Sequence, residues 1–177
     1  MKPISLVLSW VARGTAFVFG IYALYALYVY FLSGQTASDF PFRGLSNQNG
    51  VFGMIVGGAA IAIWVARRIY VEMKKRKLPD FELTRQAILF LRKNHIVFGW
   101  ITLVTVTAHG LYYLFVSTNK TFEVYTGWIS WGVLVVLTLL GVFFDKKLAD
   151  KQKIKRVKLY HIGFAFVFAA GALLHML

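Results

Sequence analysis

Cysteine is absent from this sequence of 177 residues, and acidic residues are scarce. Without cysteine the chain can form no disulfide, no thiolate metal site and no iron–sulfur cluster, and it cannot attach a c-type haem through C-x-x-C-H. Only seven aspartates and glutamates stand against twenty lysines and arginines. None of the seven lies in a long apolar stretch, so carboxylates are excluded as ligands or proton acceptors within these stretches.

Apolar residues make up 58% of the chain, more than the roughly half expected of a soluble domain. They gather in five stretches, each close to the about 20 residues that a helix needs to cross the hydrocarbon core. We therefore predict an all-α integral membrane helical bundle, a single domain over residues 1–177 with five transmembrane helices. The helices are expected at about 4–33, 50–68, 94–117, 126–145 and 158–177.

Basic residues gather in two of the four segments that connect these helices. Nine lysines and arginines lie in residues 67–93 and seven in residues 146–158, whereas the other two connections hold only Arg43 and Lys120. Short loops rich in lysine and arginine stay on the cytoplasmic side. The amino terminus is therefore expected inside and the carboxyl terminus outside. The net charge of +13 requires no nucleic acid as a partner and suits anionic membrane lipid.

Three local patterns add detail. The segment 33–50 is rich in glycine, serine and asparagine, which predicts irregular turns outside the membrane. The stretch GMIVG in the second helix places two glycines four residues apart, which favours close helix packing. Pro79 is expected to break the chain, and the apolar positions of FELTRQAILFLRKN predict a surface-lying helix that leads into the third span.

Histidine occurs only four times, as His95 and His109 in the third helix and as His161 and His175 in the fifth. Both separations are fourteen residues, about 3.9 turns, so the two side chains of each helix point to nearly the same face, roughly 21 Å apart along the axis. The third and fifth helices run in the same direction, because one crossing separates them. His95 is thus expected level with His161 near the cytoplasmic side, and His109 level with His175 near the outer side.

Two histidines at one depth on facing helices suit the two axial positions of a flat macrocycle, and imidazole is a ligand of haem iron. The pattern predicts two haem b, with His95 and His161 on the inner iron and His109 and His175 on the outer iron. The pattern does not suit a non-haem metal site, because no carboxylate or cysteine accompanies either histidine pair as a further ligand. The alternative is that each histidine is only a polar residue at the membrane interface.

Further residues are expected beside these sites. Phe168 lies seven residues from both histidines of its helix and is expected between the haems. It would lie on the electron path or would simply pack in the core. Thr102 is the corresponding midpoint of the third helix. Gly99 and Gly163 are expected to let the backbone approach the inner macrocycle closely. Candidate partners for the haem propionates, or simply interfacial cations, are Arg13, Arg67, Arg68, Arg92 and Lys158 inside and Arg43 and Lys120 outside.

From Arg85 to His175, about half of the chain, the sequence resembles the ferric reductase-like transmembrane domain shared by membrane ferric reductases and NADPH oxidases. The resemblance is carried by the histidine spacing and by VTAHGLYYL, GWISWGVLVVL and KLYHIGFAFVFAAGALLH. In size the chain is closer to the haem-bearing membrane subunit of the bacterial methionine sulfoxide reductase system. The resemblance implies four haem-ligating histidines in an oxidoreductase component of the bacterial cytoplasmic membrane, with electrons passing through that membrane.

The sequence departs from this family in two ways. The family usually has a sixth helix, whereas here the sequence ends two residues after His175, so a partner helix, another subunit or lipid is expected to support the outer haem. No G-x-G-x-x-G occurs, so the electron donor is expected to be another protein, such as a flavoprotein, or quinol. The acceptor is expected outside, as ferric iron, oxygen or a partner protein, and the sequence equally permits inward flow.

Two other functions remain open. Respiratory cytochrome b also uses two parallel helices with this histidine spacing, so the chain could be a quinol-oxidising subunit of a larger complex. That function calls for an ionisable proton acceptor in the membrane, but no carboxylate lies within the apolar stretches, and the Pro-Glu-Trp-Tyr motif of that family is missing. The second alternative is a haem-free assembly or scaffold protein.

Overall fold

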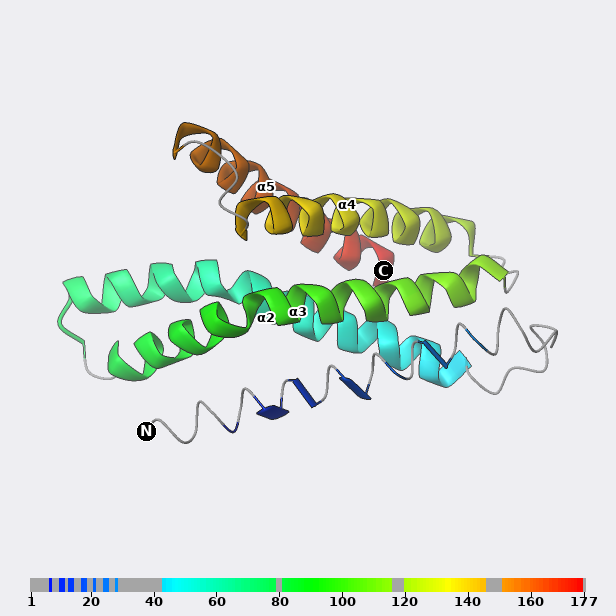
Figure 1. Ribbon diagram of the computed structural model, residues 1–177, viewed down its shortest axis with the longest axis horizontal. Helices are drawn as coiled ribbons and strands as arrows, with labels where there is room; N and C mark the ends of the chain where they lie inside the picture. The colour runs from blue at the N-terminus through cyan, green and yellow to red at the C-terminus, as the bar shows by residue number, and fades with distance from the viewer. Residues whose placement is uncertain are drawn as a thin grey trace.

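A computed structural model describes residues 43–78, 81–115, 120–145 and 151–176, together with positions 7, 10, 11, 13, 14, 17, 18, 21, 24, 25 and 28. The continuous segments form four helices and no strand (Figure 1). They are α2 (Arg43–Lys75), α3 (Phe81–Phe115), α4 (Thr121–Asp145) and α5 (Lys151–Met176).

The all-helical class is confirmed. Each of the four helices contains a segment long and apolar enough to cross a membrane, at Ser46–Lys75, Glu82–Tyr113, Thr121–Val142 and Arg156–Met176. The chain is therefore a multi-pass integral membrane protein. The predicted first span, at about 4–33, lies largely outside the described residues, and the single positions described there are helical.

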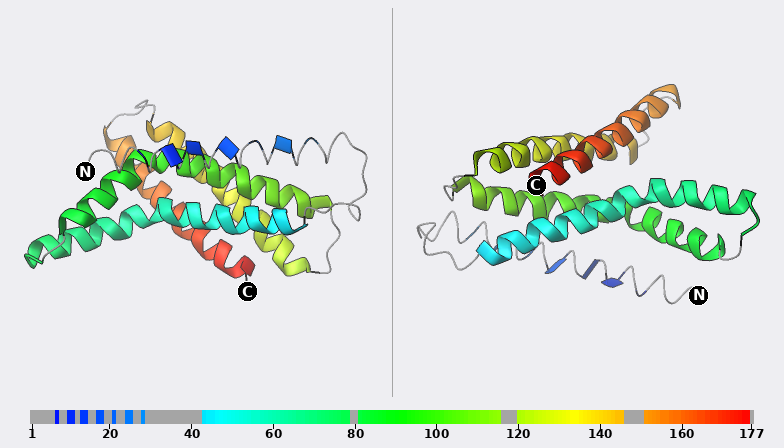
Figure 2. Two further views of the ribbon diagram at one scale, coloured as in Figure 1. Left: turned by 90° about the horizontal axis from the view of Figure 1, so that it is seen from below. Right: turned by 180° about the vertical axis from the view of Figure 1, so that it is seen from behind.

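The four helices form two antiparallel hairpins, α2–α3 and α4–α5, each with extensive contact between its own two helices. The α4–α5 hairpin lies obliquely across the α2–α3 hairpin (Figure 2). Contact between the hairpins is made mainly by α3 with α4, whereas α3 and α5 approach closely at few backbone positions.

The α2–α3 hairpin is longer than the sequence suggests. At 1.5 Å per residue its helices measure roughly 50 Å, against about 30 Å for a hydrocarbon core. The prediction of a separate surface-lying helix before the third span is wrong, because one continuous helix begins at Phe81 and enters the span directly. The end of the predicted irregular segment 33–50 is also helical, since α2 begins at Arg43.

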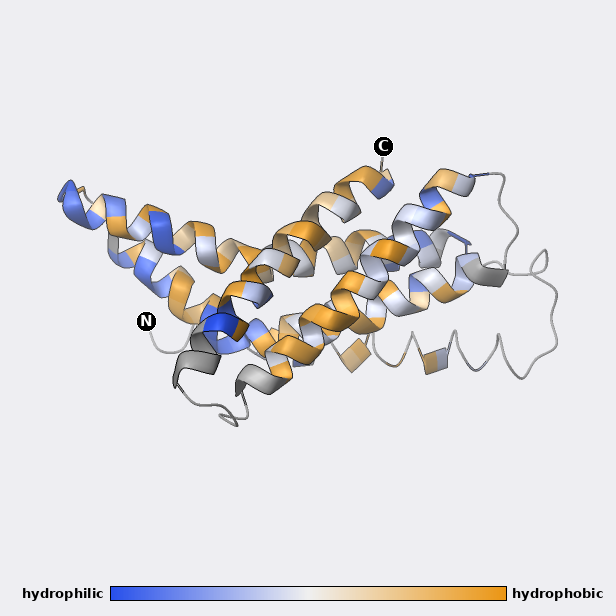
Figure 3. Ribbon diagram, turned by 90° about the horizontal axis from the view of Figure 1, so that it is seen from above, coloured by the Kyte–Doolittle hydropathy of each residue, from blue (hydrophilic) through white to orange (hydrophobic). Residues whose placement is uncertain are grey.

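The sharp end of α2 has a local cause. Lys77 has a positive φ of 51°, its N–H bonds to the Lys74 carbonyl at 3.3 Å, and the N–H of Leu78 bonds to the Met73 carbonyl at 3.0 Å. This pair of hydrogen bonds is the Schellman arrangement, which satisfies carbonyls that the helix end leaves free. Hydrophilic residues gather at this tip of the hairpin (Figure 3).

Glycine allows α2 and α3 to pack closely. A Cβ at Gly53 would lie 2.8 Å from Thr105 Oγ1 and from Val106 Cγ2, and one at Gly57 would lie 3.2 Å from Thr102 Cγ2. Both glycines are buried. The GMIVG stretch therefore packs two helices together, as predicted from its small residues.

One hydrogen bond between described residues links the hairpins, at the level of the outer histidine pair. The indole Nε1 of Trp131 in α4 donates to Thr107 Oγ1 in α3 at 2.9 Å. Such a bond is favoured inside a membrane, where neither partner has water as an alternative. It fixes α4 beside α3, and α4 in turn places α5.

Candidate functional site

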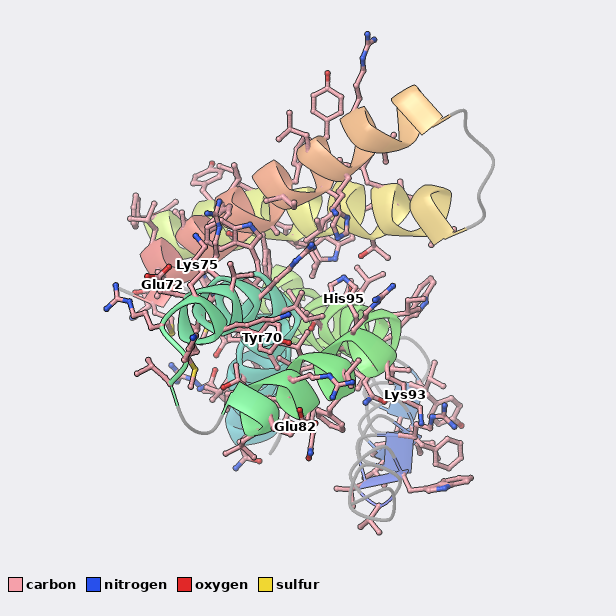
Figure 4. All side chains as sticks on the ribbon, turned by 90° about the vertical axis from the view of Figure 1, so that its left-hand side faces the viewer. Tyr70, Glu72, Lys75, Glu82, Lys93 and His95 are labelled. Atoms are coloured by element: carbon pink, nitrogen blue, oxygen red, sulfur yellow. The ribbon has the colours of Figure 1, made fainter. Side chains whose placement is uncertain are left out.

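The four histidines form two pairs between α3 and α5, with the two ring planes of each pair steeply inclined to one another. The ring centroids of His95 and His161 lie 5.9 Å apart with the ring planes at 69°, and those of His109 and His175 lie 5.9 Å apart with the planes at 84°. Figure 4 shows His95 between α3 and the α4–α5 hairpin, with Lys75, Glu72 and Glu82 around the outside. The structure thus brings together the same two pairs that the fourteen-residue spacing predicts.

Both rings of the outer pair, His109 and His175, are oriented by a backbone carbonyl. Nδ1 of His109 lies 2.9 Å from the Ser46 carbonyl oxygen of α2, and Nδ1 of His175 lies 2.7 Å from the Glu123 carbonyl oxygen of α4. A carbonyl only accepts, so Nδ1 must carry the ring proton in both. Nε2 is then the atom with a free lone pair, which is the form of histidine that binds a metal.

The inner pair, His95 and His161, is buried differently. The Ala60 carbonyl of α2 faces the His95 ring, and the Leu137 carbonyl of α4 faces the His161 ring. The two Nδ1 atoms are nevertheless buried without a hydrogen bond of good geometry in the part of the chain that the structure describes. The inner rings are therefore less firmly oriented than the outer ones.

The geometry of each pair fits a metal held between two imidazoles. Two metal–nitrogen bonds of about 2 Å, with the roughly 1 Å from each nitrogen to its ring centre, place the centroids about 6 Å apart. Among the described residues no group of three or more metal-ligating side chains gathers. Two protein ligands are too few for a typical non-haem site but are the complete axial set of a haem, whose ring supplies the other ligands.

Phe168 occupies the middle of the bundle. Its side chain is only 5% exposed, and its Cε1 would lie 3.3 Å from a Cβ built at Gly57. Thr102, 1% exposed, lies at the same level and donates to the Phe98 carbonyl at 2.8 Å. Phe168 thus separates the two histidine pairs, while a part in electron transfer stays a prediction.

The glycines expected beside the inner site are not the ones that contact histidines. Gly163 is exposed, because two residues after His161 the helix faces the other way. A Cβ at Gly99 would meet no atom within 4 Å, so a role against a macrocycle stays a prediction. The glycines that lie against histidine rings are instead Gly50, Gly127 and Gly141, on the neighbouring helices.

The candidate propionate partners lie on exposed surface. Arg43 interacts electrostatically with Tyr112, and Lys120 pairs with Glu123, whose carbonyl accepts from His175. These two cations are therefore near the outer pair. The remaining candidates are exposed cations of the other end or of the first predicted span: Arg13, whose guanidinium lies over Trp10, Arg68, which lies over Trp64, and Arg67, Arg92 and Lys158.

No protein-family model, no curated protein and no solved structure matches this chain. The histidine geometry therefore carries the functional inference.

Proposed function

We propose that this protein is the membrane subunit of an electron-transfer system and binds two b-type haems through its four histidines. One observation carries the proposal: two histidine pairs, at two depths of a membrane bundle, each have ring centroids 5.9 Å apart. A haem held at each pair would supply one-electron redox chemistry, and two such groups at the two ends of the bundle would form a route for electrons across the membrane.

The chain's own residues hold and orient the ligands. The carbonyls of Ser46 and Glu123 orient the rings of His109 and His175 through Nδ1, which leaves Nε2 as the atom that would bind iron. Apolar side chains of α3, α4 and α5 exclude water from the space between the pairs. Phe168 fills the interval between them with an aromatic ring.

The proposed topology has five spans, with the amino terminus cytoplasmic and the carboxyl terminus outside. Its support is the tip of the α2–α3 hairpin, which carries basic residues and lies at the same end of the bundle as the beginning of α5 (Figure 1). His95 and His161 lie toward that end. A flavoprotein or quinol would deliver electrons there, and ferric iron, oxygen or a partner protein would accept them outside.

The absorption spectrum of the purified protein tests haem binding directly. We expect a reduced-minus-oxidised difference spectrum of low-spin b-type haem, and two haems per chain by extraction and quantification. Protein that is folded and free of haem after expression with an ample haem supply would contradict the proposal and favour a scaffold function.

Single substitutions test which histidines share a site. His95→Ala and His161→Ala are each expected to remove the inner haem, and His109→Ala and His175→Ala the outer one. Gln48→Ala, at an exposed position of α2, is the control and should retain both. Loss of the same haem from His95→Ala and His175→Ala would contradict the pairing.

A further inference from the structure

The four histidine rings face one repeated backbone feature. Each ring faces a carbonyl of the neighbouring helix, and these carbonyls belong to Ser46 and Ala60 in α2 and to Glu123 and Leu137 in α4. Both pairs of carbonyls are fourteen residues apart, the same spacing as the histidines. The repeat follows from antiparallel packing, because each step along α3 or α5 is matched by an opposite step along its neighbour.

Glycine follows the carbonyl by four residues in three of the four places. Gly50 follows Ser46, Gly127 follows Glu123 and Gly141 follows Leu137. Four residues is about one helical turn, so carbonyl and glycine lie on one face and are adjacent along it. An imidazole can therefore lie on the glycine and reach the carbonyl with Nδ1.

The contact with glycine is close at the outer pair and loose at the inner pair. A Cβ at Gly50 would lie 2.9 Å from Nδ1 of His109, and one at Gly127 would lie 3.0 Å from Cε1 of His175. A Cβ at Gly141 would lie 3.4 Å from Cε1 of His161, an ordinary contact. At the fourth place, beside His95, the residue is Trp64 instead of glycine.

Hydrogen bonding divides the pairs in the same way. His109 and His175 have short bonds from Nδ1 to a carbonyl, whereas Nδ1 of His95 and of His161 is without a well-formed bond within the described segments. Close glycine and formed hydrogen bond thus occur together, at both outer rings and at neither inner ring. At the outer pair, where each ring lies closest to its glycine, Nδ1 reaches the carbonyl.

We infer that Gly50 and Gly127 are positioning residues of the outer site, and that they give it a lower reduction potential than the inner site. A hydrogen bond from Nδ1 to a carbonyl makes Nε2 a stronger donor, and stronger axial donation stabilises the oxidised iron. This inference rests on the proposed function. The outer site, with two such bonds, is the one that is harder to reduce.

Redox titration of the haem-loaded protein, followed by absorbance, tests this order. We expect two one-electron steps in the unaltered protein. His109→Ala, which removes the outer haem, should abolish the step at lower potential, and His161→Ala should abolish the step at higher potential. The reverse assignment, or one shared potential, would overturn the inference while the two haems themselves would still support the proposed function.

Alanine substitutions test the glycines. Gly50→Ala and Gly127→Ala each force the outer ring away from its carbonyl, so the lower step should move to higher potential or be lost, with the higher step unchanged. Gly141→Ala is the matched comparison beside the inner pair, and Gly58→Ala, where a Cβ would meet nothing within 4 Å, is the control. Neither of these two variants should change the potential of the lower step.

The inner haem reports folding in the same samples. Alanine is favoured over glycine in a helix, so helix propensity does not explain a loss in these variants. Loss of both haems from Gly50→Ala or Gly127→Ala would overturn the inference, because the glycine would then act on the whole fold. An equally large shift of the lower-potential step in Gly141→Ala would also overturn the inference.

Discussion

Gly57 of α2 lies against Phe168 of α5, so that a Cβ at this glycine would come within 3.3 Å of Phe168 Cε1. The two residues belong to different hairpins, and their contact lies midway between the two histidine pairs. The same Cβ would also lie 3.2 Å from Cγ2 of Thr102 in α3. Three helices thus meet at one position without a side chain of its own.

Substitution at this position should loosen the bundle. In Gly57→Val the added methyl groups enter space held by Phe168 and Thr102, and overpacking of this kind costs about 1–3 kcal/mol. The neighbouring Gly58→Val is the matched control, because Gly58 is exposed and its Cβ would meet nothing within 4 Å. Thermal unfolding in detergent should show a lower midpoint for Gly57→Val than for Gly58→Val. Equal midpoints would show that the contact adds nothing.

Phe168 itself should contribute to stability whether or not electrons pass near it. Phe168→Ala empties a site that is 5% exposed, and such truncations cost roughly 3–5 kcal/mol in well-packed cores. Phe168→Leu keeps most of the volume but no aromatic ring, and should cost much less. Unfolding midpoints measure the contribution of Phe168 to packing. If Phe168→Leu keeps its fold but slows electron transfer between the sites, the aromatic ring contributes to the transfer.

Helical periodicity was enough to predict which histidines meet. The direction of a side chain repeats every 3.6 residues, so the pairing of His95 with His161 follows once two helices run the same way. Helix ends were less predictable, because hydropathy detects only the part that crosses lipid. α2 continues through charged residues as far as Lys75 and ends just before Pro79, as the proline predicts, but the positive φ of Lys77 was not predicted.

The glycines beside the rings were missed for a different reason. Gly50 and Gly127 lie on helices that carry no histidine, and only the register between neighbouring helices brings them to His109 and His175. A single sequence does not contain that register. One signal was available: Gly127 and Gly141 are fourteen residues apart, the spacing of the histidines themselves.

The ring planes predict an electron paramagnetic resonance signature if the proposed function is correct. Nearly perpendicular axial imidazoles leave two iron d orbitals almost equal in energy, which makes the low-spin ferric signal strongly anisotropic. The planes meet at 84° in the outer pair and 69° in the inner pair. The more anisotropic signal should therefore be the one that His175→Ala removes. Two weakly anisotropic signals, typical of parallel rings, would contradict this geometry.

If the outer site has the lower reduction potential, the direction of electron transfer is affected. Between two sites of unequal potential an electron comes to rest at the higher one, here the inner. Outward transfer is then unfavourable by itself, but a membrane that is negative inside favours it by about 2.3 kcal/mol per 100 mV for a full crossing. The direction of flow would thus depend on the membrane potential as well as on donor and acceptor.

The absence of cysteine makes the topology directly testable. Lys75→Cys places one thiol at the exposed end of α2, and Thr121→Cys places one at the exposed beginning of α4, toward the opposite end of the bundle. A maleimide that cannot cross membranes should label Thr121→Cys in intact cells, and Lys75→Cys only after the membrane is opened. The unaltered chain has no thiol to react and serves as the blank. Labelling of Lys75→Cys in intact cells would reverse the proposed orientation, and with it the assignment of His95 and His161 to the cytoplasmic side.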